Sequence, residues 1–188
     1  MVIVPYQSVW PQEFRQLGGI LWNGLQTLAL RIDHIGSTAV PGLAAKDRID
    51  IQVTVAALSP DVDAALNRIG YRNLKDFVSD HVPPGYPADP QQWAKWVYEP
   101  PAGQRPTNLH VRVEGRANQR YPLLFRDYLR AHPAAAEAYA QVKIALAARH
   151  PNDKDAYYAV KDPVCDILMA AAEAWATQTG WRPPPSDA

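Results

Sequence analysis

The amino-acid sequence predicts one α+β domain over residues 1–180, with a mixed β-sheet, flanking helices and a C-terminal helical cover. The chain has 188 residues, which is enough for one ordinary hydrophobic core and short for two. In about residues 1–118, segments with the period of a strand alternate with helical segments, whereas about 119–180 has helical periods alone. Residues 181–188 are expected to be a frayed tail.

The first elements of the chain are predicted to be a helix and two strands. From Pro11 onward, apolar residues recur every three or four positions, which is typical of one buried helical face: Phe14, Leu17, Leu21, Leu25 and Leu28. Residues 28–35 are then typical of a strand, and residues 47–57 are a clearer one because apolar and polar residues alternate there. The polar side of this second strand carries Asp50 and Gln52.

A second helix is predicted between Ser59 and Gly70. Ser59 is a typical N-cap, Pro60 suits the first helical position, and Gly70 favours a stop. A proline-rich stretch follows, and residues 93–99 within it are strand-like, which indicates a hairpin with long, stiff connections.

A further strand over residues 107–115 repeats the alternation of the second one, with a polar side made of His110, Arg112 and Glu114. The rest of the chain is predicted to be helical, over residues 123–131, 134–149 and 153–179. Pro163 either interrupts the last helix or begins a new one.

Composition excludes several classes of function. Lys plus Arg and Asp plus Glu both number 19, so no overall positive field attracts nucleic acid, and nonspecific nucleic-acid binding is not expected. No stretch of eighteen apolar residues occurs, so we expect no membrane association and a soluble, cytoplasmic protein. Cys165 is the only cysteine, which leaves no intrachain disulfide. No pattern predicts an oligomeric state.

The turn Gly36-Ser37-Thr38 between the first two strands is a candidate phosphate cradle. Glycine lets backbone N–H groups approach a phosphate closely, and the serine hydroxyl adds a donor. The alternative is a tight turn that needs small residues for its own geometry. Asp50 follows on the next strand, and a carboxylate beside a phosphate is what magnesium bound to a nucleotide requires.

Five segments carry a family resemblance: HIGSTAVPGLAAKDRIDI, NLHV, LLFRDYLRAHP, YAQVKIALA and YYAVK. They are similar to the GrpB-like family, whose members are assigned by similarity to the nucleotidyltransferase superfamily of DNA polymerase β and the aminoglycoside nucleotidyltransferases. The resemblance runs from about Tyr6 to Trp175 and implies a nucleotidyltransferase-like mixed sheet with flanking helices.

The superfamily pattern is Gly-Gly or Gly-Ser, a spacer of about a dozen residues, and two carboxylates separated by one residue. Gly36, Ser37 and Asp50 match this pattern, and Gln52 does not. The resemblance implies Mg²⁺ as cofactor, with Asp50 as catalytic metal ligand. Because Gln52 is a neutral amide, Glu114 is our candidate for a further metal ligand, with Asp47 as the alternative. His110 is expected to hydrogen-bond the substrate rather than a metal.

Basic residues are candidates for binding the phosphate groups of a substrate. They are Lys46, which the family shares, Arg112 on the polar strand, and Arg126, Arg130, Lys143 and Lys161 on the predicted helices. Arg126 and Arg130 are four residues apart on one helical face, where like charges favour an anionic partner. That partner is either a substrate phosphate or a carboxylate such as Asp127.

Two functions follow from the resemblance. In the first, the protein transfers a nucleotidyl group from magnesium-NTP to an unknown acceptor. In the second, it is a non-catalytic module that binds a nucleotide or another phosphorylated small molecule. Domains of this family also occur appended to dephospho-coenzyme A kinases, which implies a possible connection with coenzyme A metabolism.

Overall fold

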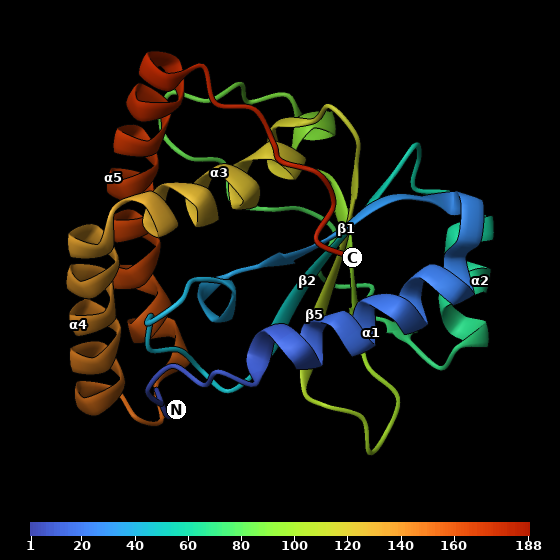
Figure 1. Ribbon diagram of the computed structural model, residues 1–188, viewed down its shortest axis with the longest axis horizontal. Helices are drawn as coiled ribbons and strands as arrows, with labels where there is room; N and C mark the ends of the chain where they lie inside the picture. The colour runs from blue at the N-terminus through green and yellow to red at the C-terminus, as the bar shows by residue number, and fades with distance from the viewer.

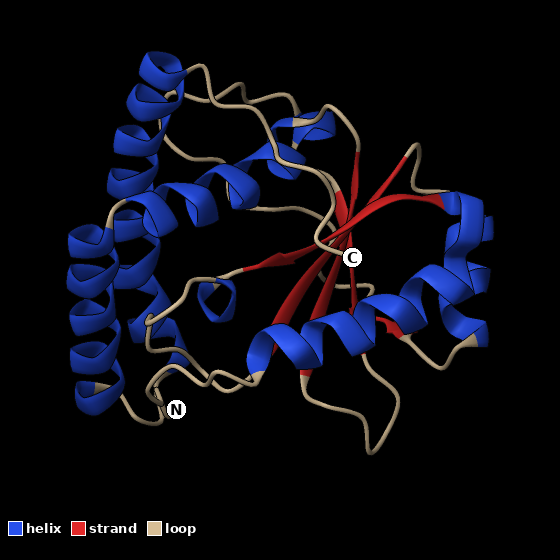
Figure 2. Ribbon diagram, viewed as in Figure 1, coloured by secondary structure: helices blue, strands red, loops and turns tan.

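A five-stranded mixed sheet forms the centre of the computed structural model, which describes all residues from Met1 to Ala188 (Figure 2). Its strands, in the spatial order β1-β2-β5-β4-β3, are β1 Ala29–Ile35, β2 Ile49–Val55, β5 Thr107–Val113, β4 Lys95–Glu99 and β3 Arg72–Asn73. β2 and β5 are parallel, and the other neighbouring pairs are antiparallel. The predicted α+β class and mixed sheet are therefore confirmed.

Helices cover the two faces of the sheet unequally (Figure 1). α1 (Trp10–Leu25) and α2 (Pro60–Arg68) lie on one face, and α3 (Ala117–Ala131), α4 (Pro133–Arg149) and α5 (Lys154–Thr179) gather on the other side. The largest hydrophobic cluster contains 20 buried residues and joins α1 and α2 to the sheet. None of the helices is long and apolar enough to cross a lipid bilayer.

Local sequence signals set most helix ends as predicted. Ser59 caps α2, since its Oγ accepts a hydrogen bond from the Val62 amide at 3.4 Å. One predicted helix start, at residue 123, and the predicted interruption at Pro163 are wrong. α3 begins at Ala117 and continues through Pro122, because packing of its buried face outweighs the one backbone hydrogen bond that the proline removes. α5 is one continuous helix through Pro163, capped at its start by Asp153.

The C-terminal tail is packed along β1, so the expected fraying is wrong. The Ser186 hydroxyl donates to the carbonyl of Ile32 at 2.7 Å, and the Ala188 amide donates to the same carbonyl at 3.2 Å. Asp187 accepts from the amide of His34 at 3.0 Å. β1 is an edge strand with unpaired backbone groups, and the tail supplies their partners. Figure 1 shows the tail running back from α5 to β1.

The parallel register of β2 and β5 aligns their polar residues. Asp50 is opposite Asn108, and Gln52 is opposite His110. Since alternate residues of a strand share a face, these four side chains lie on the sheet face that α3 to α5 cover. The prediction that the two strands present their polar sides together is confirmed.

Candidate functional site

A cavity of about 630 Å³ lies between the polar face of the sheet and the C-terminal helices. Among its lining residues are most of the predicted ones: Gly36, Ser37, Thr38, Lys46, Asp50, His110, Arg112, Lys143 and Lys161. The wall contains six basic and four acidic residues, and aromatic rings such as Phe77, Trp93 and Tyr158. A cavity of this size, with polar groups converging at one end, is suited to a small molecule.

Gly36 and Asp50 meet at the base of this cavity. Gly36 has a φ of +71°, and a Cβ at this position would overlap the Asp50 carboxylate. Only glycine therefore allows both this backbone conformation and the close approach of the two strands. Residues 37–39 form a 3₁₀ turn, and the first amides of such a turn have no carbonyl partner within it.

The Asp50 carboxylate is held in place by one neutral donor. Asn108 Nδ2 donates to its Oδ1 at 2.6 Å. Burial raises the pKa of Asp50, and the Asn108 hydrogen bond and the charges of Arg48, Lys161 and Lys46 offset this only in part. Asp50 is therefore a hydrogen-bonding carboxylate in an otherwise basic surrounding.

Lys143 reaches from α4 to the turn. Its Nζ donates to Ser37 Oγ at 2.8 Å and to the carbonyl of Ala44, and it lies 4.6 Å from the centroid of the Tyr139 ring. Burial, followed by the neighbouring charge of Lys161, lowers the pKa of Lys143 to about 7. α4 thereby places an amine next to the Ser37 hydroxyl of the candidate phosphate cradle.

Lys46 and Lys161 flank the same region. Lys46 Nζ donates to the Tyr158 hydroxyl at 3.0 Å and lies 4.7 Å from the centroids of the Tyr157 and Tyr158 rings. Lys161 pairs with Asp162 at 3.0 Å. Burial by itself would lower the pKa of Lys161, but the adjacent Cys165 and Asp162 outweigh it and raise the pKa.

Gln52 is part of a buried polar network. Its Oε1 accepts from Arg112 at 2.9 Å, and its Nε2 donates to the carbonyl of Gln119 at 2.9 Å. Arg112 also binds Asp80 through two nitrogens, at 2.9 and 3.0 Å. An amide provides both a donor and an acceptor here, whereas a carboxylate would set its own oxygen, a second acceptor, against the Gln119 carbonyl. Gln52 is thus explained by structure, independently of any metal.

His110 and Thr38 both line the cavity, but they differ in whether their polar atoms have a hydrogen-bond partner. The Nδ1 atom of His110 is buried and has no hydrogen-bond partner. Burial and the charges of Arg112 and Lys95 hold the pKa of His110 well below its usual value, so its ring is neutral. The Thr38 hydroxyl instead pairs with His34 Nε2 at 3.0 Å, so its side chain already has a partner.

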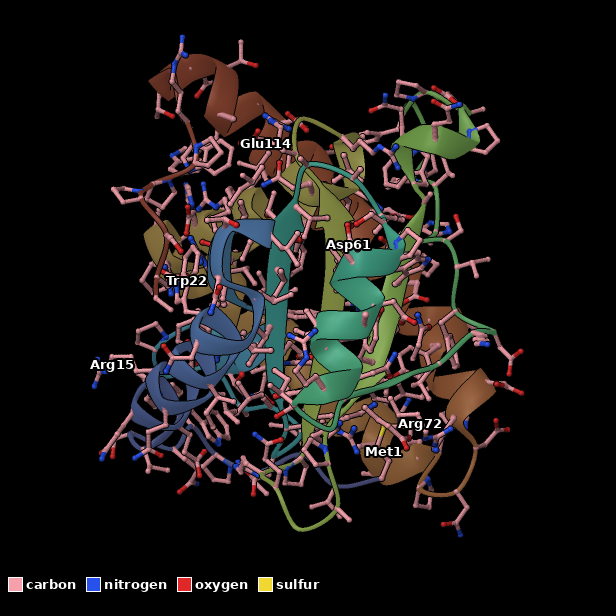
Figure 3. The ribbon with its side chains drawn as sticks, turned by 90° about the vertical axis from the view of Figure 1, so that its right-hand side faces the viewer. Met1, Arg15, Trp22, Asp61, Arg72 and Glu114 are labelled. Atoms are coloured by element: carbon pink, nitrogen blue, oxygen red, sulfur yellow. The ribbon has the colours of Figure 1, made fainter.

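The predicted pairing of Glu114 with Asp50 is wrong. Glu114 follows the last residue of β5, whereas Asp50 is opposite Asn108 near the start of that strand. Six residues of a strand span about 20 Å, so the two carboxylates cannot share an ion. Figure 3 places Glu114 at one end of the sheet, and its side chain is exposed outside the cavity.

Arg126 and Arg130 bind backbone carbonyls on either side of the Gly36 turn and do not line the cavity. Their predicted role as phosphate ligands is therefore contradicted. Arg126 is fully buried, donates to the carbonyl of His34 at 2.9 Å, and pairs with Asp127 and Asp187. Arg130 donates to the carbonyl of Ala39 at 2.9 Å. Carboxylates of α3 and the tail, rather than a ligand, compensate these two charges.

The residues present do not fit a site for two magnesium ions. Asp50 has no second carboxylate beside it, and no cluster of three or more His, Cys, Asp or Glu side chains suited to a metal occurs. Asp47 lies outside the cavity, where it accepts from Trp10 at 2.9 Å and pairs with Arg105. Neither Glu114 nor Asp47 therefore supplies the second carboxylate that the superfamily pattern has at the position of Gln52.

Sequence reasoning missed Asp80 and Asn108. Asp80 lies in the long connection before β4, which has no strand or helix period, and it binds Lys95 at 2.6 Å as well as Arg112. No local pattern could have identified it. Asn108 could have been found, since it occupies the same side of its strand as His110.

Comparison with known proteins places the chain in a family. A family model described as GrpB protein matches residues 1–171. The dephospho-CoA kinase of Mycolicibacterium paratuberculosis is 37% identical over 96% of this chain and 48% of its own length, so the chain spans about half of that relative. The UPF0157 protein PA4798 of Pseudomonas aeruginosa is 35% identical, over 92% of this chain and 67% of its own length.

Solved structures agree with this assignment. The crystal structure of conserved protein GrpB from Enterococcus faecalis aligns with a TM-score of 0.75 at 29% identity, covering 93% of this chain and 99% of that one. Cid1 in complex with its short product ApU aligns with a TM-score of 0.50 at 15% identity, covering 78% of this chain and 43% of that one, which shows a shared fold alone. The chain belongs to the GrpB family and has a nucleotidyltransferase-like fold, as the sequence resemblance implied.

Proposed function

We propose that this GrpB-family protein binds a phosphorylated small molecule, such as a nucleotide, in the cavity beside Gly36. The observation that carries the proposal is Lys143, a buried amine that faces the turn and has only neutral oxygens as hydrogen-bond partners. Lys46 and Lys161 lie in the same wall, so an anion here would meet several positive groups. The turn amides and the Ser37 hydroxyl would add hydrogen bonds to the phosphate oxygens.

Asp50 favours a ligand that also carries a hydrogen-bond donor near its phosphate. Its carboxylate lines the same end of the cavity and accepts a hydrogen bond only from Asn108. It would repel a phosphate oxygen in direct contact, but it would accept a hydrogen bond from a hydroxyl or amino group near the phosphate. A sugar phosphate or a nucleotide carries both kinds of group.

Nucleotidyl transfer from magnesium-NTP is the second candidate function. The fold shared with Cid1 and the position of Asp50 beside the turn favour it. A single carboxylate holds magnesium weakly, because this ion gives up its water reluctantly. We therefore expect binding to be the main activity and transfer to be slow or absent.

A ligand panel tests the proposal. Nucleoside mono- and triphosphates, coenzyme A precursors and sugar phosphates are each added with and without magnesium, and the shift in melting temperature is measured. A ligand at 100 times its Kd adds about 2.7 kcal/mol to the free energy of unfolding, which is a readily measured shift. Absence of any shift across the panel would contradict the proposed function.

Variants identify the site and separate the two candidates. Lys143→Met is expected to weaken binding at least tenfold, whereas Lys154→Met, at an exposed position outside the cavity, is expected to leave it unchanged. A pyrophosphate-release assay on the wild-type protein tests transfer directly. Robust release that Asp50→Asn abolishes would favour the catalytic candidate.

A further inference from the structure

Lys143 is an unusual lysine even among those of this cavity. Its side chain is 3% exposed, and its two hydrogen-bond acceptors, Ser37 Oγ and the Ala44 carbonyl, are both neutral. By contrast, Lys161 and Lys95 each have a carboxylate at hydrogen-bond distance. A buried ammonium group without a carboxylate partner is unfavourable, so the unliganded site favours the neutral amine.

The charged and titratable groups around Lys143 act in both directions. Lys161 on α5 and Lys46 in the loop before β2 disfavour a positive charge on it, whereas Cys165 on α5 and Asp50 on β2 favour one. On α4 itself, the nearby Tyr139 ring faces the amine and stays uncharged, because burial raises the pKa of its hydroxyl. Burial is the largest effect and brings the pKa of Lys143 to about 7.

We propose that the ligand of this cavity is a phosphomonoester dianion, and that its binding places a proton on Lys143. This inference rests on the proposed function and specifies its ligand class. The added proton comes from solvent and converts the Lys143 amine to an ammonium group, with no covalent change in the ligand. The ammonium group then has the anionic partner that the protein itself does not provide.

The charge of the ligand discriminates between classes of phosphate. A phosphomonoester has a second pKa near 6, so above about pH 7.5 its terminal group is a dianion with three acceptor oxygens. A phosphodiester carries one negative charge, and it compensates less of the positive charge that Lys46, Lys143 and Lys161 would bring together. We therefore expect the cavity to favour terminal phosphates over bridging ones.

Isothermal titration calorimetry with two matched probes tests the inference. Phenyl phosphate is the monoester probe, and its aromatic ring suits the aromatic part of the cavity wall. Methyl phenyl phosphate is the diester control. Titrations at pH 7.5 in two buffers with different ionisation enthalpies give the number of protons taken up. We expect more than half a proton per monoester bound, because a lysine with a pKa of about 7 is then mostly neutral.

The affinity itself should depend on pH. Since the monoester stays a dianion from pH 8 to pH 9, its Kd is expected to rise about tenfold over this unit, as protonating Lys143 becomes harder. The diester is expected to bind at least tenfold more weakly than the monoester at pH 7.5. Lys143→Arg keeps a positive charge at every pH, so it should bind the monoester without proton uptake and with a flat pH profile.

Lys143→Met should lose most of the monoester affinity, and Lys154→Met should retain both the affinity and the proton uptake. Monoester binding without proton uptake, or equal affinity for the diester, would overturn this inference while leaving phosphate binding in place. If neither probe binds at millimolar concentration while the thermal panel also shows no shift, the inference and the proposed function both fail.

Discussion

The two faces of the sheet are built on different principles. The face covered by α1 and α2 is filled with apolar side chains, such as Leu21, Ile51 and Val111, that belong to one cluster of 20 buried residues. The opposite face buries polar or charged side chains, among them Gln52, Thr54, Arg112, Asn118, Arg126 and Lys143. The apolar face holds the fold together, whereas the polar face holds charged groups that need specific partners.

This difference locates the candidate functional site. Buried polar groups lower stability unless each has a partner, and on this face most of them do. Asp80 satisfies Arg112 and Lys95, and Gln52 links Arg112 to the backbone of α3. Among the buried cations of this face, Arg112 and Arg126 pair with carboxylates, whereas Lys143 has only neutral acceptors. The group left without its charged partner is the one that a ligand would satisfy.

The largest expected effect comes from the apolar face. Leu21→Ala removes a fully buried side chain from the main cluster and is expected to lower the free energy of unfolding by about 2 to 5 kcal/mol. Urea denaturation measures the change. At temperatures where the variant is folded, its affinity for the monoester probe should equal that of the wild type. A large loss of affinity in the folded variant would show that the two faces are coupled.

The next effect comes from the charged network of the polar face. Asp80→Asn leaves Arg112 and Lys95 without their carboxylate and is expected to lower the free energy of unfolding by about 2 kcal/mol at pH 7. The pH dependence has a definite sign. Burial would raise the pKa of Asp80, but Arg112 and then Lys95 outweigh it and bring the pKa below 3.8. The stabilisation is therefore present above about pH 4 and is lost as the pH falls further.

Denaturation of wild type and Asp80→Asn from pH 7 to pH 3 tests this sign. The difference between the two proteins should shrink as the pH drops below about 4. A constant difference over this range would show that the Asp80 pKa is not lowered. Glu99, whose ion pair with Arg72 is exposed, provides the control, and Glu99→Gln should change stability by less than about 1 kcal/mol.

A smaller effect separates the cost of backbone strain from the close approach of Gly36 to Asp50. Gly36 and Gly42 both have positive φ values, +71° and +80°, but a Cβ on Gly42 would meet no atom within 4 Å. Gly42→Ala is expected to lower the free energy of unfolding by about 1 kcal/mol through strain alone. Gly36→Ala should lower it further and abolish probe binding, because its methyl group displaces Asp50. Equal effects on binding would contradict the role of the Gly36 turn.

The smallest change in stability should have the opposite sign. Lys143→Met replaces a buried lysine that has no carboxylate partner, and it is expected to raise the free energy of unfolding by up to about 1 kcal/mol at pH 6.5. Because the pKa of Lys143 is lowered to about 7 in the folded protein, the wild type is least stable below pH 7 and gains stability as the pH rises toward 10.5. The advantage of the variant should therefore decrease at pH 9.

Thermal denaturation of both proteins at pH 6.5 and 9.0, without ligand, measures this change. Lys154→Met serves as the exposed control and should show no such trend. Destabilisation by Lys143→Met at both pH values would show that Lys143 stabilises the unliganded fold. It would contradict the view that Lys143 is an unfavourable buried group whose missing partner is a ligand.

The sequence by itself determined the elements and one end of the site. Apolar periods predicted β2, β5 and most of the helices, since which residues alternate along a strand or helix is a local property. The turn at Gly36 and the carboxylate of Asp50 were also readable, because Gly36 directly follows one predicted strand and Asp50 lies on the next strand of the chain. The family resemblance correctly implied the nucleotidyltransferase-like fold.

Tertiary structure decided which charges meet. Lys143 and Ser37 are 106 positions apart, and only the packing of α4 brings the amine to the turn. Glu114 and Asp50 share a sheet face or end only if the register allows it, and the parallel pairing of β2 and β5 places them at opposite ends. Arg126 and the tail residue Asp187 likewise meet behind β1 rather than in the cavity. Local periods cannot specify such contacts, because they depend on strand register and helix docking across the whole chain.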